Sequence, residues 1–192
     1  MTDGVLSKEG TAVYGIISAT SRTGGAMAQF VAVPETQIAP LPVNTAPSAA
    51  ASLPPAGLTA HQALEAGRVK AGDRLLFTAG AGGVESLGVQ LAAARGAEVV
   101  ATAGPTNLEF VRGLGAATVI NYRYTDIATA CPGAPFDAAV DVMGGETEDA
   151  VVAAVRPAGR FTSIINSGTS LGRIAKGKVC GWRVGGSAGS EV

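Results

Sequence analysis

The stretch of residues 73–104 constrains the fold of this chain more than any other part of it. A short apolar run is followed by three closely spaced glycines, Gly80, Gly82 and Gly83. An amphipathic segment with apolar side chains at helical spacing comes next and ends at Gly96, where a second apolar run begins. This order of strand, glycine turn, helix and strand predicts a βαβ unit of the kind that binds a dinucleotide.

One residue departs from that pattern, because Glu85 stands where the pattern has its last glycine. A carboxylate in the first turn of a helix is stabilised by unpaired N–H groups and by the helix dipole, which is the electrostatic site that a pyrophosphate uses. Two anions at that place repel each other. Two interpretations are therefore open: the Glu85 side chain points outward and leaves the site intact, or the dinucleotide site is weakened or lost.

The chain beyond this unit continues in the same alternation. Apolar strands and helical segments follow one another up to residue 166, which predicts an α/β fold with a parallel sheet covered on both faces. A last strand is predicted at residues 178–184. We therefore expect a Rossmann-like, doubly wound parallel sheet of about five or six strands.

The part of the chain before this unit reads differently. Residues 30–33 are apolar and strand-like, and the six prolines of residues 34–55 predict a connector without regular structure, except for a short helical piece. Residues 58–67 have helical periodicity, with Thr59 as the expected N-cap.

Composition excludes several classes of function. The formal net charge is −1 and the 14 Lys and Arg residues are scattered, so neither nucleic acid nor a membrane surface is an expected partner. The two cysteines, Cys131 and Cys180, lack metal-ligand spacing, and His61 is the single histidine, so we expect no metal site. No signal peptide or membrane-spanning run is visible, and we expect a cytoplasmic protein.

Five stretches in order resemble one known family. They are residues 24–34, 56–64, 69–74, 120–123 and 141–146. Together they resemble the medium-chain dehydrogenase/reductase superfamily, in its zinc-free, zeta-crystallin-like quinone oxidoreductase branch. The resemblance implies a remnant of a GroES-like β domain and a proline-rich connector in residues 1–57. It also implies a Rossmann-like cofactor domain in residues 58–166, and a C-terminal strand with a flexible tail in residues 167–192.

The chain departs from the family pattern at two further places. It begins well inside the family's usual N-terminal domain, and after residue 166 it passes within a few residues to a segment that resembles the family's C-terminal strand. We interpret these features as an N-terminal truncation and an internal deletion. Family dimers pair through the sixth strand of the cofactor sheet, so a homodimer is expected only if residues 178–184 replace that strand. We expect the edge after the fifth strand to be covered, because an open edge promotes aggregation.

The resemblance assigns residues to three parts of a bound cofactor. The pyrophosphate would lie against the glycine loop, at Gly80, Gly82, Gly83 and Val84. The end of the second strand lacks the acidic residue that holds an NAD ribose, so the resemblance implies NADPH. Its 2′-phosphate would lie near Thr102, Gly104, Asn107, Tyr122 and Arg123. The nicotinamide end would be lined by Thr59, Met143, Gly144, Ile164, Ile165 and Asn166.

Two functions follow, in different classes. The first is an NADPH-dependent oxidoreductase of the quinone reductase type, which transfers a hydride to a quinone or a conjugated carbonyl without a metal or a catalytic triad. The second is a reused scaffold that has lost the cofactor and acts as a cyclase, an isomerase or a non-catalytic binding module. Glu85 is then the candidate catalytic acid or base. A small-molecule substrate is expected for either enzyme. Asp141 is interpreted as a satisfied structural carboxylate, and Arg123 as either a phosphate ligand or a solvated loop arginine.

Overall fold

A computed structural model describes residues 9–17, 25–132, 135–165 and 179–183 of the 192-residue chain. The chain divides into two compact units, Met1–Leu58 and Thr59–Val192. Within the part of the chain that is described, no helix combines the length and the hydropathy needed to cross a membrane.

The first unit is built on two short strands. β1 (Val13–Gly15) pairs antiparallel with β2 (Ile38–Pro40), so that Tyr14 lies opposite Ala39. A single 3-10 turn, η1 (Glu35–Gln37), precedes β2, and a five-residue helix, α1 (Pro47–Ala51), follows it. This small antiparallel sheet stands where the sequence predicts the remnant of a β domain.

Two predictions for the first unit are wrong. Residues 30–33 form no strand, and the Phe30 side chain is 91% exposed. Apolar and β-branched residues form a strand only where a neighbouring strand pairs with them, and β1 and β2 pair with each other instead. The proline-rich connector is also more regular than predicted, because it contains η1 and β2 as well as the expected short helix α1.

Helix α2 begins earlier than predicted. It spans Pro54–Ala66, so Thr59 lies inside the helix and is not its N-cap. The reason is the pair Pro54 and Pro55 at its first two positions. Proline is tolerated in the first turn of a helix, where its missing N–H would have no partner within the helix in any case.

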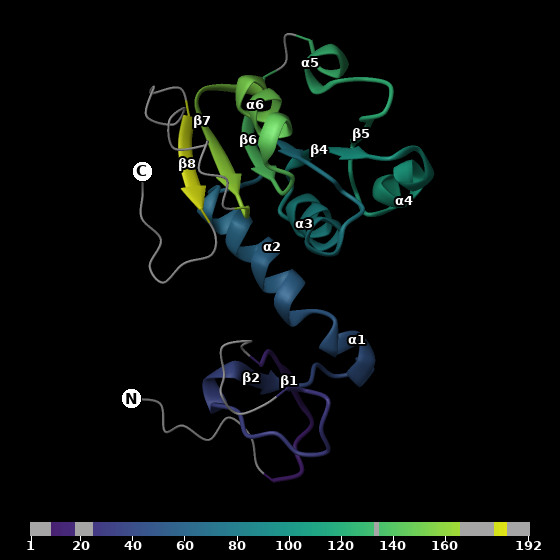
Figure 1. The fold of residues 1–192 in the computed structure, drawn as a ribbon, viewed down its shortest axis with the longest axis vertical. Coiled ribbons are helices and arrows are strands. Elements are labelled where there is room, and N and C mark those ends of the chain that lie inside the picture. The colour runs from purple at the N-terminus through teal and green to yellow at the C-terminus, as the bar shows by residue number, and fades with distance from the viewer. Residues whose placement is uncertain (1–8, 18–24, 133–134, 166–178, 184–192) are drawn as a thin grey trace. The chain divides into compact units, whose positions relative to one another are not determined.

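The second unit is a six-stranded sheet with the order β5-β4-β3-β6-β7-β8, in which every neighbouring pair is parallel (Figure 1). The strands are β3 (Arg74–Phe77), β4 (Glu98–Ala103), β5 (Thr118–Asn121), β6 (Phe136–Asp141), β7 (Val155–Ser163) and β8 (Val179–Arg183). The helical elements between them are α3 (Gly83–Ala94), η2 (Pro105–Asn107), α4 (Leu108–Gly113), α5 (Ile127–Ala130) and α6 (Gly145–Ala154). This is the doubly wound α/β fold that the sequence predicts.

The strand predicted at residues 178–184 exists and takes the sixth place in the sheet. β8 pairs parallel with β7, with Phe161 opposite Gly181. The edge of β7 is therefore covered, as expected. The connection from β7 to β8, where the internal deletion is predicted, lies outside the described residues, and the deletion stays a prediction.

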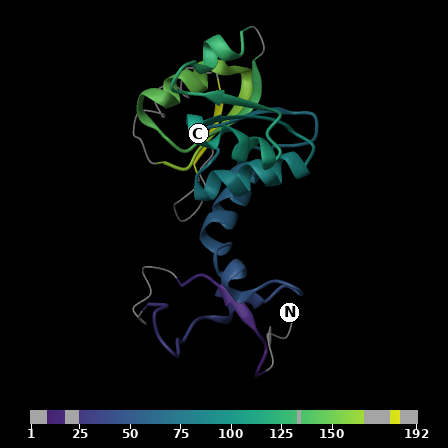
Figure 2. The same ribbon diagram turned by 90° about the vertical axis from the view of Figure 1, so that its right-hand side faces the viewer.

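Helices cover both faces of the sheet (Figures 1 and 2), and each face carries its own core. On one face, Phe77 of β3 packs with buried residues of α2, α3 and α4 such as Leu64, Val89 and Val111. On the other face, Leu76 packs with buried residues of α5 and α6. Successive residues of one strand point to opposite faces, so the uninterrupted apolar strands of the sequence serve both cores.

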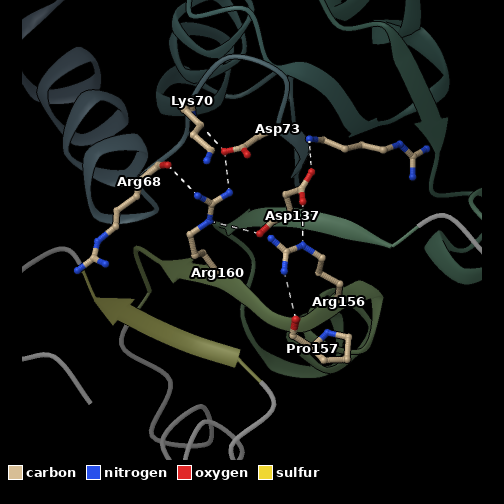
Figure 3. Close-up of polar contacts among 8 residues, drawn as sticks. Arg68, Lys70, Asp73, Asp137, Arg156, Pro157 and Arg160 are labelled. Atoms are coloured by element: carbon tan, nitrogen blue, oxygen red, sulfur yellow. Dashed lines mark hydrogen bonds and ion pairs between the residues drawn. The ribbon is translucent and has the colours of Figure 1, made fainter.

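The edge where the parallel strands begin, called the amino edge below, is held by arginine–carboxylate contacts (Figure 3). Arg160 Nη2 lies 2.6 Å from Asp73 Oδ2, and Arg160 Nη1 donates to the carbonyl of Arg68. Arg156 Nε donates to Asp137 Oδ1 at 2.8 Å, while the other Asp137 oxygen accepts from the backbone N–H of Arg74. These contacts join β3, β6 and β7. The candidate binding site lies at the opposite edge of the sheet, where the strands end.

Candidate functional site

The opposite edge, where β3 to β7 end, is called the carboxyl edge here. The loop from β3 into α3 lies directly against β4 at this edge. Ala79 N donates to Thr102 Oγ1 at 2.9 Å, and Gly80 N donates to the Thr102 carbonyl at 2.7 Å. A Cβ at Gly80 would meet the Ala101 side chain at 3.0 Å, so this close approach requires glycine. The glycine loop of the sequence is thus in the position that a dinucleotide-binding fold requires.

Helix α3 is also pressed closely onto β3. A Cβ at Gly88 would lie 2.5 Å from the ring of Phe77, a distance that real side chains do not reach. In the dinucleotide-binding pattern the last glycine serves this close packing of helix on strand. Here Gly88, three residues after Glu85, allows that packing, so the architecture is kept although the pattern's last glycine is missing.

The side chain of Glu85 folds back onto the glycine loop. Gly82 is the N-cap of α3, and Glu85 lies in the first turn with only 9% of the residue exposed. A Cβ at Gly82 would come within 2.7 Å of Glu85 Cδ and closer still to Oε2. The interpretation in which this side chain points outward is therefore wrong. Its carboxylate lies over the turn where a pyrophosphate would be expected.

The local surroundings of Glu85 act on its pKa in opposite directions. Burial raises the pKa of its carboxyl group above the ordinary value of 4.5. Hydrogen bonds from the backbone N–H groups of Glu85 and Val84 act the other way and lower it, but burial is the larger effect. The carboxylate therefore lies beside N–H groups that the first turn of α3 would otherwise offer to a ligand.

Most other N–H groups of this loop are also occupied within the protein. Ala79 and Gly80 donate to Thr102, and Gly82 N donates to the Ala79 carbonyl at 2.9 Å. Gly83 and Val84, predicted as pyrophosphate contacts, are the first residues of α3, Gly83 exposed and Val84 half-buried. The glycine loop has the correct place and shape, but in this conformation it presents few donors to a diphosphate.

The residues predicted to hold a 2′-phosphate gather at the ends of β4 and β5. The Tyr122 hydroxyl lies over Gly104, since a Cβ there would meet it at 3.3 Å. The Arg123 guanidinium lies 5.9 Å from the centre of the Tyr122 ring, and both side chains are exposed. Asn107 is exposed at the start of α4. Thr102 differs from the rest, because its hydroxyl is buried and supports the glycine loop.

A cavity of about 330 Å³ opens beside this group. Its lining comes from the ends of β4, β5 and β6 and from α5 and α6, and includes Ala79, Thr102, Tyr122, Thr125, Asp126, Met143 and Thr147. Pockets for small molecules measure about 300–1,000 Å³, so this one is large enough for one nucleoside but not for a whole dinucleotide.

Three polar residues of this lining were missed from the sequence. Thr125 and Asp126 follow β5, and Thr147 lies in the first turn of α6. Asp126 accepts a hydrogen bond from Thr129 N, which caps α5 and holds the pKa of this carboxyl below 3.8. The sequence contained one signal for these three residues, namely their position after predicted parallel strands. Polar residues that follow parallel strands collect at the carboxyl edge of the sheet.

The end of β6 is fixed by a buried carboxylate. Asp141 Oδ1 accepts from Thr78 Oγ1 at 2.9 Å, and Oδ2 accepts from Gly144 N at 2.8 Å. Thr78 Oγ1 in turn accepts from Val142 N. Asp141 is fully buried and has its partners, which confirms its interpretation as a structural carboxylate. The network holds the turn in which Gly144 adopts φ +66°, a conformation that favours glycine.

The predicted nicotinamide contacts divide into three groups. Met143 and Gly144 follow β6 while Ile164 and Ile165 follow β7, and the pairing of these parallel strands brings the four residues to the carboxyl edge. Met143 is 56% exposed and also lines the cavity, whereas Ile164 packs against the core. Thr59 lies within α2 and stays a prediction. Asn166 lies outside the described residues.

The fold and this edge define a class of protein: a Rossmann-like domain with its glycine loop and cavity in the place where such domains bind a dinucleotide. Residues 83–172 match the family model described as zinc-binding dehydrogenase. Among the residues that the structure describes, no three His, Cys, Asp or Glu side chains are grouped to hold a metal ion.

The similarity to individual proteins is more specific. The chain is 40% identical over 122 residues to a chloroplast quinone-oxidoreductase homologue of Spinacia oleracea, covering 60% of this chain and 36% of the relative. It is 34% identical over 171 residues to the chloroplast NADPH-dependent alkenal/one oxidoreductase of Arabidopsis thaliana, covering 86% and 43%. An alcohol dehydrogenase superfamily protein from Novosphingobium aromaticivorans superposes with a TM-score of 0.82 at 33% identity, covering 91% and 54%.

The chain belongs to the medium-chain dehydrogenase/reductase superfamily, in its quinone oxidoreductase-like branch. It spans about a third to a half of the length of the relatives just described. The site on the cofactor domain can therefore be compared with theirs, whereas the activity and substrate of the whole protein are proposals.

Proposed function

We propose that this protein is an NADPH-dependent oxidoreductase of the quinone reductase type, which transfers a hydride to a quinone or a conjugated carbonyl. One observation carries the proposal: the glycine loop, the Tyr122–Arg123 pair and the cavity lie together at the carboxyl edge of a doubly wound sheet. Two relatives support the class of reaction, since one is named a quinone-oxidoreductase homologue and the other an NADPH-dependent alkenal/one oxidoreductase.

The 2′-phosphate end of NADPH fits the residues present. The end of β4, at residues 101–104, carries no carboxylate that would repel a phosphate or hold an unmodified ribose. Arg123 supplies a cation 5.9 Å from the centre of the exposed Tyr122 ring, and a charge-assisted bond from a guanidinium to a phosphate is stronger than a neutral hydrogen bond. A side chain at Gly104 would crowd the Tyr122 hydroxyl, because its Cβ would lie 3.3 Å from it.

The pyrophosphate fits less well, because the Glu85 carboxylate lies over Gly82 and beside N–H groups of the first turn of α3. At the other end of the cofactor, Met143, Gly144 and Ile165 would border the nicotinamide, and bound NADPH would supply the hydride. The role of these residues is to position the ring and to exclude water, as expected for a reaction that depends mainly on proximity.

We also propose that the protein acts on a small-molecule substrate, forms a homodimer and is located in the cytoplasm.

A second candidate function is favoured by Glu85 itself. A scaffold that has lost the cofactor would keep the cavity and, at the glycine loop, a buried carboxylate of raised pKa, and such a group suits general acid or base chemistry. The protein would then be a redox-independent cyclase or isomerase, or a binding module without catalysis.

A titration with NADPH separates the two candidates. We expect NADPH to bind the protein in the micromolar to high-micromolar range, measured by its fluorescence, and its absorbance to fall when a soluble quinone is added. The matched control is Arg123→Ala, which removes the phosphate cation from an exposed position and should weaken NADPH while leaving NADH unchanged. Absence of NADPH binding at millimolar concentration, in a protein whose melting is cooperative, would contradict the reductase and favour the reused scaffold.

A further inference from the structure

We propose that the Glu85 carboxylate is an intramolecular substitute for the cofactor's diphosphate, and that it determines which nucleotides the site accepts. Ligands with a 5′-diphosphate must displace it, whereas a nucleoside 2′-phosphate binds beside it without competition. The inference rests on the proposed function, since it concerns the same site. It arises from the pyrophosphate position, which is the part of NADPH that the residues present fit poorly.

The position of Glu85 is the first argument. Its carboxylate lies against Gly82, the N-cap of α3, at the point where the backbone of a dinucleotide-binding loop makes room for phosphate oxygens. The residue is almost fully buried, so the carboxylate is held in this place by its surroundings and is not a solvated surface charge. A diphosphate and this side chain cannot occupy the turn together.

The hydrogen bonds are the second argument. The N–H groups of Val84 and Glu85 act on the carboxylate, and those of Ala79, Gly80 and Gly82 are paired within the loop and β4. A carboxylate and a phosphate are both acceptor-only anions that satisfy the unpaired donors of a helix N-terminus. Glu85 therefore supplies the charge and the acceptors that the loop would otherwise take from the cofactor.

The cavity is the third argument, because it is separate from the turn that Glu85 occupies. Its lining includes Tyr122, Thr125, Asp126 and Thr147, but neither Glu85 nor Gly82. Its volume of about 330 Å³ suits a single nucleoside, and the Arg123 guanidinium lies near Tyr122 for a 2′-phosphate. The half of the cofactor that carries the 2′-phosphate thus has a place that Glu85 leaves untouched.

The experiment compares two probes on the wild type and three variants, of which Glu85→Gly is the third, by isothermal titration calorimetry. The probes are NADPH and adenosine 2′-monophosphate, which lacks the diphosphate. The other two variants are Glu85→Gln and the control Glu98→Gln. Glu98 is an exposed carboxylate at the amino edge, so its substitution removes the same charge away from the site. Circular dichroism and thermal melting establish that each variant is folded, and Gln preserves the shape of the side chain.

We expect Glu85→Gln to bind NADPH about tenfold more tightly than the wild type, because one repulsion between neighbouring anions is removed. Adenosine 2′-monophosphate should bind both proteins equally, and Glu98→Gln should match the wild type for both probes. Glu85→Gly, which also restores the glycine, should bind NADPH at least as tightly as Glu85→Gln.

Three results would overturn the inference. Equal NADPH affinity of the wild type and Glu85→Gln would show that the carboxylate does not compete, and the proposed reductase would stand. An equal gain for both probes would show a general effect of charge and not occupation of the diphosphate position. Failure of all the proteins, Glu85→Gly included, to bind NADPH would overturn the proposed function together with the inference.

Discussion

Two carboxylates at opposite edges of the sheet, Asp137 and Glu85, have pKa values shifted in opposite directions. At the amino edge, hydrogen bonds from the Arg74 N–H and the Arg156 side chain hold the pKa of Asp137 below its ordinary value of 3.8. At the carboxyl edge, burial raises the pKa of Glu85 above 4.5. The charged form of Asp137 is thus stabilised, whereas the charged form of Glu85 is disfavoured by burial. A charge that its surroundings disfavour is more readily displaced by a ligand, so Asp137 serves the fold and Glu85 belongs to the site.

The largest effect is expected at the amino edge, at Asp73. Its side chain is 6% exposed and pairs with Arg160, so Asp73→Asn leaves a largely buried guanidinium without its counter-charge. We expect a loss of about 3 kcal/mol in the free energy of unfolding, measured with urea. The control is Glu65→Gln, which breaks the exposed pair with Arg95 and should cost less than about 1 kcal/mol. Equal losses would show that burial does not distinguish the two pairs.

The carboxyl edge has a structural part as well, and two buried threonines test it. Thr78 bridges Asp141 and Val142 N, so Thr78→Val leaves buried polar groups without partners and should cost about 2 kcal/mol in urea unfolding. Thr162 is equally buried, but its hydroxyl has no hydrogen-bond partner among the described residues. Thr162→Val is therefore expected to be neutral or stabilising. A loss at both positions would mean that the methyl groups fill space poorly and that hydrogen bonding is not the cause.

The sequence predicted the architecture because its signal there is local and repeated. In residues 73–104, apolar periodicity and glycine positions agree on strand, turn, helix and strand, and β3, α3 and β4 follow that order. Where the signal depended on a distant partner, the prediction failed: residues 30–33 have strand composition, but no strand of the described residues pairs with them. The start of α2 was missed because proline was interpreted as ending regular structure, although it also begins helices.

The site could be predicted as a set of positions but not as a set of orientations. Tyr122, Arg123 and Gly104 come together as expected, because strand ends determine their place. Thr102 was expected at a phosphate, whereas its hydroxyl supports the loop through Ala79. The direction of the Glu85 side chain was left open, since residue type and spacing do not decide between two rotamers on the first turn of a helix.

Asp137 provides a smaller prediction, which concerns pH. Its pKa is lowered in the folded state, so the stabilisation is present above the unfolded-chain value of 3.8 and is lost as the pH falls through the folded-state value. We expect Asp137→Asn to lose about 1 kcal/mol near neutral pH and to unfold with less dependence on acid than the wild type. Urea unfolding of both proteins at several pH values measures this. Parallel curves below 3.8 would contradict it.

Glu85 provides the smallest effect on stability and the sharpest contrast, because its pH dependence has the opposite sign. Its pKa is raised in the folded state, so the stabilisation is complete below the unfolded-chain value of 4.5 and is lost as the pH rises through the folded-state value. The N–H groups of Val84 and Glu85 oppose this effect, and we expect a change of less than about 1 kcal/mol. Glu85→Gln should lack this step, so its stability relative to the wild type should improve above pH 4.5.

The same urea series resolves the two carboxylates, because the stability contributed by Asp137 changes below pH 3.8 and that contributed by Glu85 changes above pH 4.5. A wild type that loses stability as the pH falls below 4.5, when Glu85→Gln does not, would mean that the carboxylate is stabilised in its charged form. Glu85 and Asp137 would then behave alike.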